Sequence, residues 1–390
     1  MAGIYRVTGT IKHYDWGGTT YIPALLKTDN KDKKPFAEYW MGIHPLAISM
    51  VELPDGKTQN LTNFVKSLPY LFKVLDVKNM LSIQVHPSGV SAIKEFAREN
   101  HENIPLDSPQ RNYKDENHKP EMLVALSDFW LLHGFKPEKE LVYILLNVAE
   151  LRELLPVFNQ SGYAGLYRYV MEMPQEEVNR ILQPLLDNIL PVYKNGNEDK
   201  TDEDFWAARA AITFSKQKNI DRGIFSIYLF NIVQLKKGQA LFQGAGLPHA
   251  YLEGQNVELM SNSDNVLRGG LTAKHIDVKE LLKHVKCEPT IPHILIGEQI
   301  AEHVLLYKTP VPDFELSVMD LQYNDVVNAL SDSTEILLVT DGAVQVDQGN
   351  INLEAGNPSA VVLPKTAYSI TCFSDKATVF RASVPVSRGE

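Results

Sequence analysis

The spacing of apolar residues changes twice along the chain, and these changes limit the folds that it can adopt. Between Pro137 and Lys218 the apolar residues recur at helical spacing, as Leu141, Leu145 and Val148 illustrate. On both sides of this stretch, short apolar segments show the alternation that is typical of strands. We therefore predict a mainly β protein that is interrupted by an all-helical insert at residues 135–221.

The β-rich parts contain several definable segments. We predict strands at 71–77, 81–87, 118–126, 224–228 and 256–260, and helices at 90–99 and 278–285. Within residues 289–390, Asp341-Gly342 is a hairpin signal between 336–339 and 343–346. Short strands at near-even spacing predict a small β-barrel or jelly roll there. It contains no His or Gln pair at chelating spacing, so we expect it to be structural.

Charge and cysteine content narrow the classes of partner. The chain has 390 residues, a formal net charge of -10 and no basic run, so we expect neither nucleic-acid binding nor binding to anionic membranes. Cys287 and Cys372 are the only cysteines, and the N-terminus lacks the apolar core of a signal peptide. No apolar run approaches the ~20 residues of a membrane span. Without a heptad pattern or an apolar seam, we expect a cytoplasmic monomer.

The strand predicted at Leu81–Pro87 carries the first chemical signal. Ser82, Gln84 and His86 would share one face of this strand. Ile83 and Val85 would point into a core from the other face. A carboxamide oxygen and an imidazole held side by side form a chelating edge for one metal ion. The alternative is a half-buried strand whose polar face meets solvent.

Other potential ligands lie far from this strand along the chain. Glu121 begins a predicted strand and His249 lies in a Gly-rich turn before another one. Together with Gln84 and His86 they form a set of two imidazoles, one carboxylate and one carboxamide, which suits zinc and would also accept cobalt, manganese or iron. Because the chain has eleven histidines, spacing alone leaves open the alternative of hydrogen-bonded core histidines.

Several segments of the chain resemble one known family. They are Tyr14–Gly17, Ala37–Pro45, Leu71–Leu75, Leu81–Pro87, Asn117–Glu121, Gly246–Tyr251 and Ser263–Lys274. In sequence and in order they are similar to type I phosphomannose isomerases, over about the first 285 residues and more loosely beyond.

This resemblance implies a fold, a cofactor and an activity. The implied fold is a cupin-type β-sandwich or jelly-roll metal domain at 1–134 and 222–288, with the helical insert at 135–221 and a second cupin-like domain at 289–390. One zinc ion per chain would be held by Gln84, His86, Glu121 and His249. The implied reaction is the aldose–ketose isomerisation of mannose 6-phosphate and fructose 6-phosphate. Arg268 matches the family's active-site arginine.

Such a reaction places demands on the side chains around the metal. Removing a proton next to a carbonyl creates an anionic enediolate, which a cation and a guanidinium would stabilise. The candidates for a local positive pocket are Lys73, Ser82, Lys119, Arg268 and Lys274. One or two of these residues would bind the phosphate. Lys119 and Glu258 are catalytic candidates, Glu258 as an acid or base, and the identity of the base stays open. Asp264 precedes Arg268 in the same loop and is a further candidate for substrate binding.

Each of these residues also has a purely structural interpretation. Lys73 could be a solvated edge charge, and Lys119 could form a plain ion pair with Glu121. Glu258 could face solvent, and Asp264 could only cap its loop. At the level of the whole chain, the alternatives are an iron-dependent cupin oxygenase and a sugar-phosphate-binding cupin without turnover. Metal analysis and an isomerase assay would separate these functions.

Overall fold

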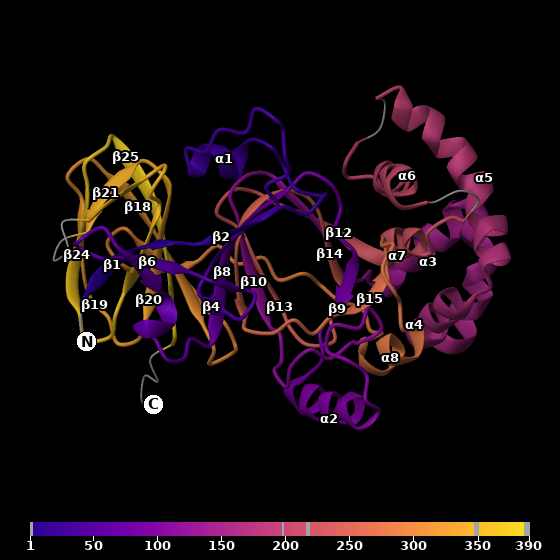
Figure 1. The fold of residues 1–390 in the computed structure, drawn as a ribbon. Helices are drawn as coiled ribbons and strands as arrows, with labels where there is room; N and C mark the ends of the chain where they lie inside the picture. The colour runs from indigo at the N-terminus through magenta and orange to yellow at the C-terminus, as the bar shows by residue number, and fades with distance from the viewer. Residues whose placement is uncertain (1–2, 197–198, 216–218, 347–350, 386–390) are drawn as a thin grey trace.

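The structure is a computed structural model that describes residues 3–385 except 197–198, 216–218 and 347–350. Two β-rich parts and one helical part lie in a row (Figure 1). The C-terminal strands occupy one end, the helical insert the other, and the strands of the first part lie between them. The predicted β fold with a helical insert is confirmed. Among the described residues, no helix combines the length and the apolar composition that a membrane crossing requires.

A ten-stranded sheet system forms the middle of the molecule. Its main path is β12 (Phe230–Leu235), β11 (Phe129–Phe135), β14 (His249–Ser261), β8 (Tyr70–Val77), β3 (Glu38–Met41) and β2 (Thr10–Lys12). The other strands are β9 (Ile83–Val85), β10 (Glu121–Ala125), β13 (Ala240–Gln243) and β15 (Leu267–Gly270). Strand β14 is the central strand of this system, since it pairs with β8, β9, β10 and β11. The predicted strand 256–260 is part of this longer strand.

The C-terminal part is a sandwich of two further sheets. The larger sheet runs in the order β16 (Glu298–Ala301), β17 (Val304–Tyr307), β18 (Glu315–Gln322), β25 (Lys376–Ser383), β20 (Glu335–Asp341), β23 (Ser359–Val362), β1 (Ile4–Thr8), β6 (Met50–Glu52) and β7 (Thr58–Asn60). The smaller sheet runs β19 (Val326–Leu330), β24 (Ala367–Cys372), β21 (Ala343–Val346) and β22 (Ile351–Glu354). The N-terminal strands thus pair with C-terminal ones, while the predicted domain boundaries stay a prediction.

One apolar layer joins the middle of the molecule to this sandwich. Phe314, Leu316 and Val318 share a face, as predicted, and belong to the same buried cluster as Phe72 and Leu259 of the middle sheet. The opposite face of the larger sheet packs on the smaller one. Both faces of the strands inside the larger sheet are therefore buried, while its edge strands β16 and β7 are exposed.

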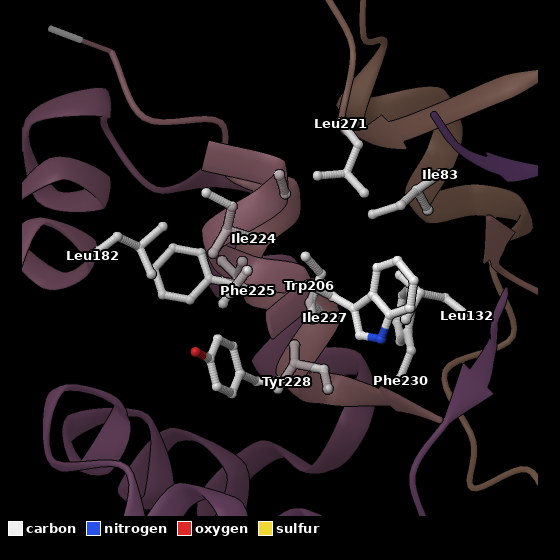
Figure 2. Packing of buried hydrophobic residues seen from close by; sticks show 14 of the residues in the cluster. Ile83, Leu132, Leu182, Trp206, Ile224, Phe225, Ile227, Tyr228, Phe230 and Leu271 are labelled. Carbon is white, nitrogen blue, oxygen red and sulfur yellow. The ribbon is translucent and has the colours of Figure 1, made fainter. Parts of the chain in front are cut away.

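The helical insert packs against the strands that carry the predicted metal ligands. Its helices are α3 (Glu138–Asn147), α4 (Leu155–Glu172), α5 (Gln175–Lys194) and α6 (Glu203–Phe214), and α7 (Gly223–Leu229) follows its predicted end and packs with them. Figure 2 shows α7 with Leu182 of α5 on one side and Ile83 of β9 on the other. The insert therefore supports β9 from behind, on the face that points away from the predicted ligands.

Two local predictions were wrong. Residues 224–228 belong to helix α7, and every residue of that helix is buried. A helix that is buried on all sides has no polar stripe, so its apolar run cannot be told from a strand. Asp341-Gly342 does not form a hairpin, because β20 and β21 pair in different sheets. Gly342 has φ 75°, and a Cβ there would collide with the Lys376 carbonyl. A glycine is therefore required where the chain passes from one sheet to the other.

The remaining helices and short strands complete the described chain. The helices α2 (Gly89–His101) and α8 (Val278–His284) match the predicted ones at 90–99 and 278–285. The other short elements are α1 (Tyr21–Leu25), β4 (Ile43–His44), β5 (Ala47–Ile48) and 3₁₀ turns at Leu61–Asn63 and Ala149–Leu154.

Candidate metal centre and active site

Strand pairing places three of the predicted side chains in one row. Gln84 of β9 lies opposite His249 of β14 on one side and opposite Arg268 of β15 on the other. Directly opposed residues of antiparallel strands point to the same face of a sheet. Ile83 and Val85 point the other way and are fully buried in the core that the insert completes. The structure thus has the alternation that the sequence predicts for residues 81–87.

A compact cluster of buried ligand atoms lies beside this row. His86, Glu121 and His249 each offer one ligand atom, and these atoms lie within 4.8 Å of one another. Nε2 of His86 is 3.2 Å from Oε1 of Glu121, and Nε2 of His249 is 3.3 Å from Oε2. His86 directly follows β9, Glu121 begins β10 and His249 begins β14, and these three strands meet at this point.

Backbone carbonyls orient both imidazoles. Nδ1 of His86 is 2.9 Å from the carbonyl oxygen of Asn265, and Nδ1 of His249 is 3.0 Å from that of Leu247. A carbonyl can only accept, so each Nδ1 carries the hydrogen and each Nε2 presents a lone pair toward Glu121. This arrangement is typical of metal-ligating histidines.

The protonation states suit a bound cation. Burial lowers the pKa of His86 to about 4, so the imidazole is neutral near pH 7. Burial opposes the ionisation of Glu121, but the Lys119 ammonium 3.1 Å away is the largest opposing influence, and the pKa of Glu121 lies well below the ordinary value. Nε2 of His86 is buried and makes no well-aligned hydrogen bond to the described residues. Two imidazoles and one carboxylate, with one buried nitrogen left unsatisfied, fit a zinc ion.

A cavity of about 250 Å³ opens above this cluster. The predicted site residues that line it are Lys73, Gln84, Lys119, Glu121, His249, Glu258, Asp264, Arg268 and Lys274. His86 lies behind the cavity wall, and Ser82 lines an adjoining cavity of about 450 Å³. The two cavities share Gln84, Arg268 and Lys274, so they form one continuous cleft. The fold therefore brings together all eleven residues that the sequence singles out.

Two cations in this cleft have no charged partner. Arg268 is half-buried, and neither it nor Lys274 forms an ion pair with any residue in the part of the chain that the structure describes. Burial lowers the pKa of both side chains, and the positive charge of Arg268 lowers the pKa of Lys274 further. A half-buried guanidinium without a carboxylate partner is an anion site, in a chain whose net charge is -10.

The other lysines of the cleft are paired. Lys73 is buried, with Nζ 2.9 Å from Glu258 and 3.8 Å from Glu38. Burial alone would lower the pKa of Lys73, but these carboxylates outweigh it and raise the pKa. Lys119 lies 3.1 Å from Glu121. Lys73 is therefore not a solvated edge charge, and Glu258 does not face solvent.

Sequence reasoning missed several residues that line the cleft. Glu38 and Trp40 lie on β3, where Trp40 hydrogen-bonds Glu38 and stacks over the Lys73 ammonium. The hydroxyl of Tyr251 donates to Glu258 over 2.7 Å. Glu38 and Trp40 are two residues apart, so alternation along a strand places them on one face. That signal was available in the sequence, whereas the Tyr251 contact depends on the path of β14.

Comparisons with known proteins agree with this geometry. Residues 4–138 match the family model for the catalytic domain of type I phosphomannose isomerase. The mannose-6-phosphate isomerase of Escherichia coli (strain K12) is 34% identical over 370 residues, which cover 90% of this chain and 92% of that protein. The rat enzyme of the same name (Rattus norvegicus) is 31% identical over 97% of this chain and 98% of its own length.

Solved structures of similar proteins cover nearly the whole chain. A variant of phosphomannose isomerase from Salmonella typhimurium aligns with a TM-score of 0.87 at 30% identity, over 99% of this chain and 100% of that one. A zinc-bound mannose 6-phosphate isomerase aligns with a TM-score of 0.80 at 30% identity, with the same coverage. The protein described here therefore belongs to the type I phosphomannose isomerase family.

Proposed function

We propose that this chain is a zinc-dependent isomerase that interconverts mannose 6-phosphate and fructose 6-phosphate. The observation that carries the proposal is Arg268, which forms no ion pair with the described residues and lines a cleft whose floor holds His86, Glu121 and His249. A cation site and a separate anion site within one cleft suit a substrate that has both hydroxyl oxygens and a phosphate. The activity that the relatives' names state is the one that this chemistry supports.

The metal ligands in this proposal are Gln84, His86, Glu121 and His249. Gln84 joins the set because strand pairing places it beside His249 at the same cavity. When bound, zinc supplies a Lewis acid that polarises substrate oxygens. The carbonyls of Asn265 and Leu247 keep both imidazoles in the tautomer that can bind it.

The chain's own residues bind the substrate and handle its protons. Arg268 and Lys274 are free to neutralise a phosphate or a developing oxyanion, and Ser82 can donate a hydroxyl from the adjoining part of the cleft. Lys73 and Tyr251 hold both oxygens of Glu258, which fixes its carboxyl group at the cavity wall as a candidate for proton transfer at carbon. Lys119 can donate toward a substrate oxygen beside Glu121.

A coupled assay tests the proposal. Zinc-loaded protein should form fructose 6-phosphate from mannose 6-phosphate, and the activity should disappear with a chelator and return with zinc. Arg268→Ala should lower kcat/KM by about 10²–10³-fold at unchanged zinc content, because a donor to a developing anion is lost. Arg168→Ala, which removes an exposed arginine of α4, is the matched control. Absence of turnover in fully zinc-loaded protein would exclude the isomerase.

Metal analysis tests the two alternatives. An iron-dependent oxygenase would need iron for its activity and would consume oxygen. A sugar-phosphate-binding protein without turnover would bind mannose 6-phosphate and release it unchanged.

We also expect a cytoplasmic monomer that does not bind nucleic acid, since Cys287 and Cys372 are unpaired and the net charge is -10. Light scattering of the purified protein checks the monomer.

A further inference from the structure

His44 is a buried histidine beside the cleft that the proposed function leaves without a role. It ends β4, inside the segment 37–45 that marks the family resemblance, and is 3% exposed. The indole of Trp40 packs on it edge to face, with ring centroids 5.1 Å apart. Since Trp40 lines the cavity, His44 lies directly behind the cavity wall.

The surroundings of His44 fix its tautomer. The backbone N–H of Leu46 donates to Nδ1 over 3.2 Å, so this nitrogen is an acceptor. Burial lowers the pKa of His44, against the opposing effect of Asp264. The ring is therefore neutral near pH 7, and its single hydrogen is on Nε2. Nε2 lies 3.4 Å from Oδ2 of Asp264.

Asp264 is held by its main chain while its carboxylate faces the cleft. The backbone N–H of Asp264 donates to Oδ2 of Asp115 over 2.8 Å, and the hydroxyl of the neighbouring Ser263 donates to Oδ1 of Asp115. The Asp264 side chain lines the cavity and is 36% exposed. Among the described residues, none donates a hydrogen bond to its Oδ1. One carboxylate oxygen thus faces His44 and the other is available to a ligand.

We propose that His44 is a positioning residue that orients the Asp264 carboxylate, and that Asp264 carries the hydroxyl proton of the isomerisation. The proposal rests on the proposed function. In the reaction, a proton leaves carbon 2 and another is added at carbon 1, while oxygen 2 loses a proton and oxygen 1 gains one. Asp264 would accept the proton from oxygen 2 and return it to oxygen 1, so no co-reactant is needed. Glu258 is left to the carbon proton.

The contact of 3.4 Å between His44 and Asp264 is longer than a formed hydrogen bond. Catalytic hydrogen bonds are often long in the free enzyme and tighten when substrate binds. Asp115 holds the main chain of Asp264, and the His44 imidazole packs against Trp40. Only a small rotation of the Asp264 side chain is therefore needed to form the hydrogen bond.

Two substitutions of His44 test the proposal. His44→Phe keeps a ring against Trp40 and removes the donor, while His44→Gln places an amide N–H near the position of Nε2. We expect His44→Phe to lower kcat about 10- to 100-fold, since general acid–base catalysis contributes about 10²–10⁴-fold. KM and zinc content should change little. His44→Gln should recover at least part of the lost kcat.

The Asp264→Asn background separates positioning from packing. If His44 acts through Asp264, His44→Phe should change kcat less than about twofold in that background, because the coupled partner is already lost. An undiminished effect of His44→Phe there would overturn the proposal. So would wild-type kcat in folded, zinc-loaded His44→Phe. If His44→Phe does not fold, the kcat values of His44→Gln and Asp264→Asn are compared instead. A lower kcat in His44→Gln than in Asp264→Asn would also overturn the proposal.

Isotope exchange distinguishes oxygen from carbon proton transfer. In deuterated water, slower hydroxyl proton transfer should lengthen the life of the enediolate in His44→Phe. Deuterium incorporation at carbon 2 of the remaining mannose 6-phosphate should therefore increase relative to product formation. An unchanged ratio would contradict the assignment of Asp264 to the hydroxyl proton. Absence of turnover in the wild-type protein would instead refute the proposed isomerase itself, so the two failures can be told apart.

Discussion

At the scale of single residues, the chemistry of the cleft follows from which side chains are paired. Glu121 contacts both imidazoles and Lys119, whereas Arg268 contacts no carboxylate in the described part of the chain. A carboxylate between two imidazoles attracts a metal ion, and a guanidinium without a carboxylate partner attracts an anion. The division of the cleft into a cation side and an anion side is thus a property of individual contacts.

Removal of one ligand should release the metal. We expect His249→Ala to lose zinc and activity together, because the remaining ligands bind with an affinity lower by about tenfold or more. Metal content by mass spectrometry and the isomerase assay measure both effects. His275→Ala is the control, since His275 is exposed and lies outside the cluster. Full zinc occupancy in His249→Ala would show that the ligand set is wrong.

The buried Lys73 should matter for stability as well as for chemistry. Lys73→Met leaves Glu258 and Glu38 without their ammonium partner, and breaking a buried ion pair in this way costs about 3–5 kcal/mol. Urea unfolding measures this free energy. The exposed pair of Lys308 and Glu298 provides the control, because Lys308→Met should cost less than about 1 kcal/mol. Equal costs for the two variants would contradict the burial argument.

Sequence patterns could predict the residues of the site but not their partners. The pair Gln84 and His86 is visible as strand alternation, and the family resemblance points to Glu121, His249 and Arg268. The pairing of Lys73 with Glu258 depends on the register between β8 and β14, which are separated by the whole insert. No local pattern encodes such a register. The same holds for the approach of His44 to Asp264.

At the scale of elements, side-chain contacts at Glu280 connect the helices near the cleft. We call this group of contacts the Glu280 brace. Helices α2 and α8 are joined through Glu280, which accepts hydrogen bonds from Tyr113 over 2.8 Å and from Lys283 over 2.6 Å. Arg98 of α2 lies 3.4 Å from the same carboxylate. Helix α8 is the next element after β15, the strand that carries Arg268, and residues 271–277 connect the two.

The Glu280 brace should weaken in acid. Burial opposes ionisation of Glu280, but hydrogen bonds from His284, Lys283 and Tyr113 outweigh it and lower the pKa from 4.5 to about 2. A pKa that is lower in the folded state gives stability above pH 4.5 that is lost as the pH falls through about 2. Glu280→Gln should therefore cost about 1.5–3 kcal/mol at pH 7 and progressively less toward pH 2.

Urea unfolding at several pH values measures this difference. The control is Glu302→Gln, at a position whose side chain is 90% exposed, which should change the free energy of unfolding by less than about 0.5 kcal/mol at every pH. A cost of Glu280→Gln that is constant between pH 7 and pH 2 would contradict the charge-based account of the brace.

Element predictions failed where burial or long-range pairing overrides local pattern. Helix α7 is apolar on all sides, so residues 224–228 were predicted as a strand. The chain bends at Gly342, but the strands on its two sides belong to different sheets. By contrast, helices α2 and α8 expose one face to solvent and have the periodic pattern that local prediction requires.

At the scale of the whole molecule, the site lies where strands from distant parts of the chain converge. Strand β14 collects β8, β9 and β10, and the insert packs behind β9 (Figure 1). At the opposite end, Ile4 of β1 pairs with Val362 of β23, which no sequence pattern predicts. The family resemblance could predict the architecture of the chain, but this closure needs the three-dimensional structure.

The most direct test of the account is an anomalous difference map at the zinc absorption edge, from crystals of active, zinc-loaded protein. The account predicts one peak per chain, bounded by Nε2 of His86, Nε2 of His249 and the side-chain oxygens of Glu121 and Gln84. A peak at another position, or full activity with no peak between these residues, would contradict it.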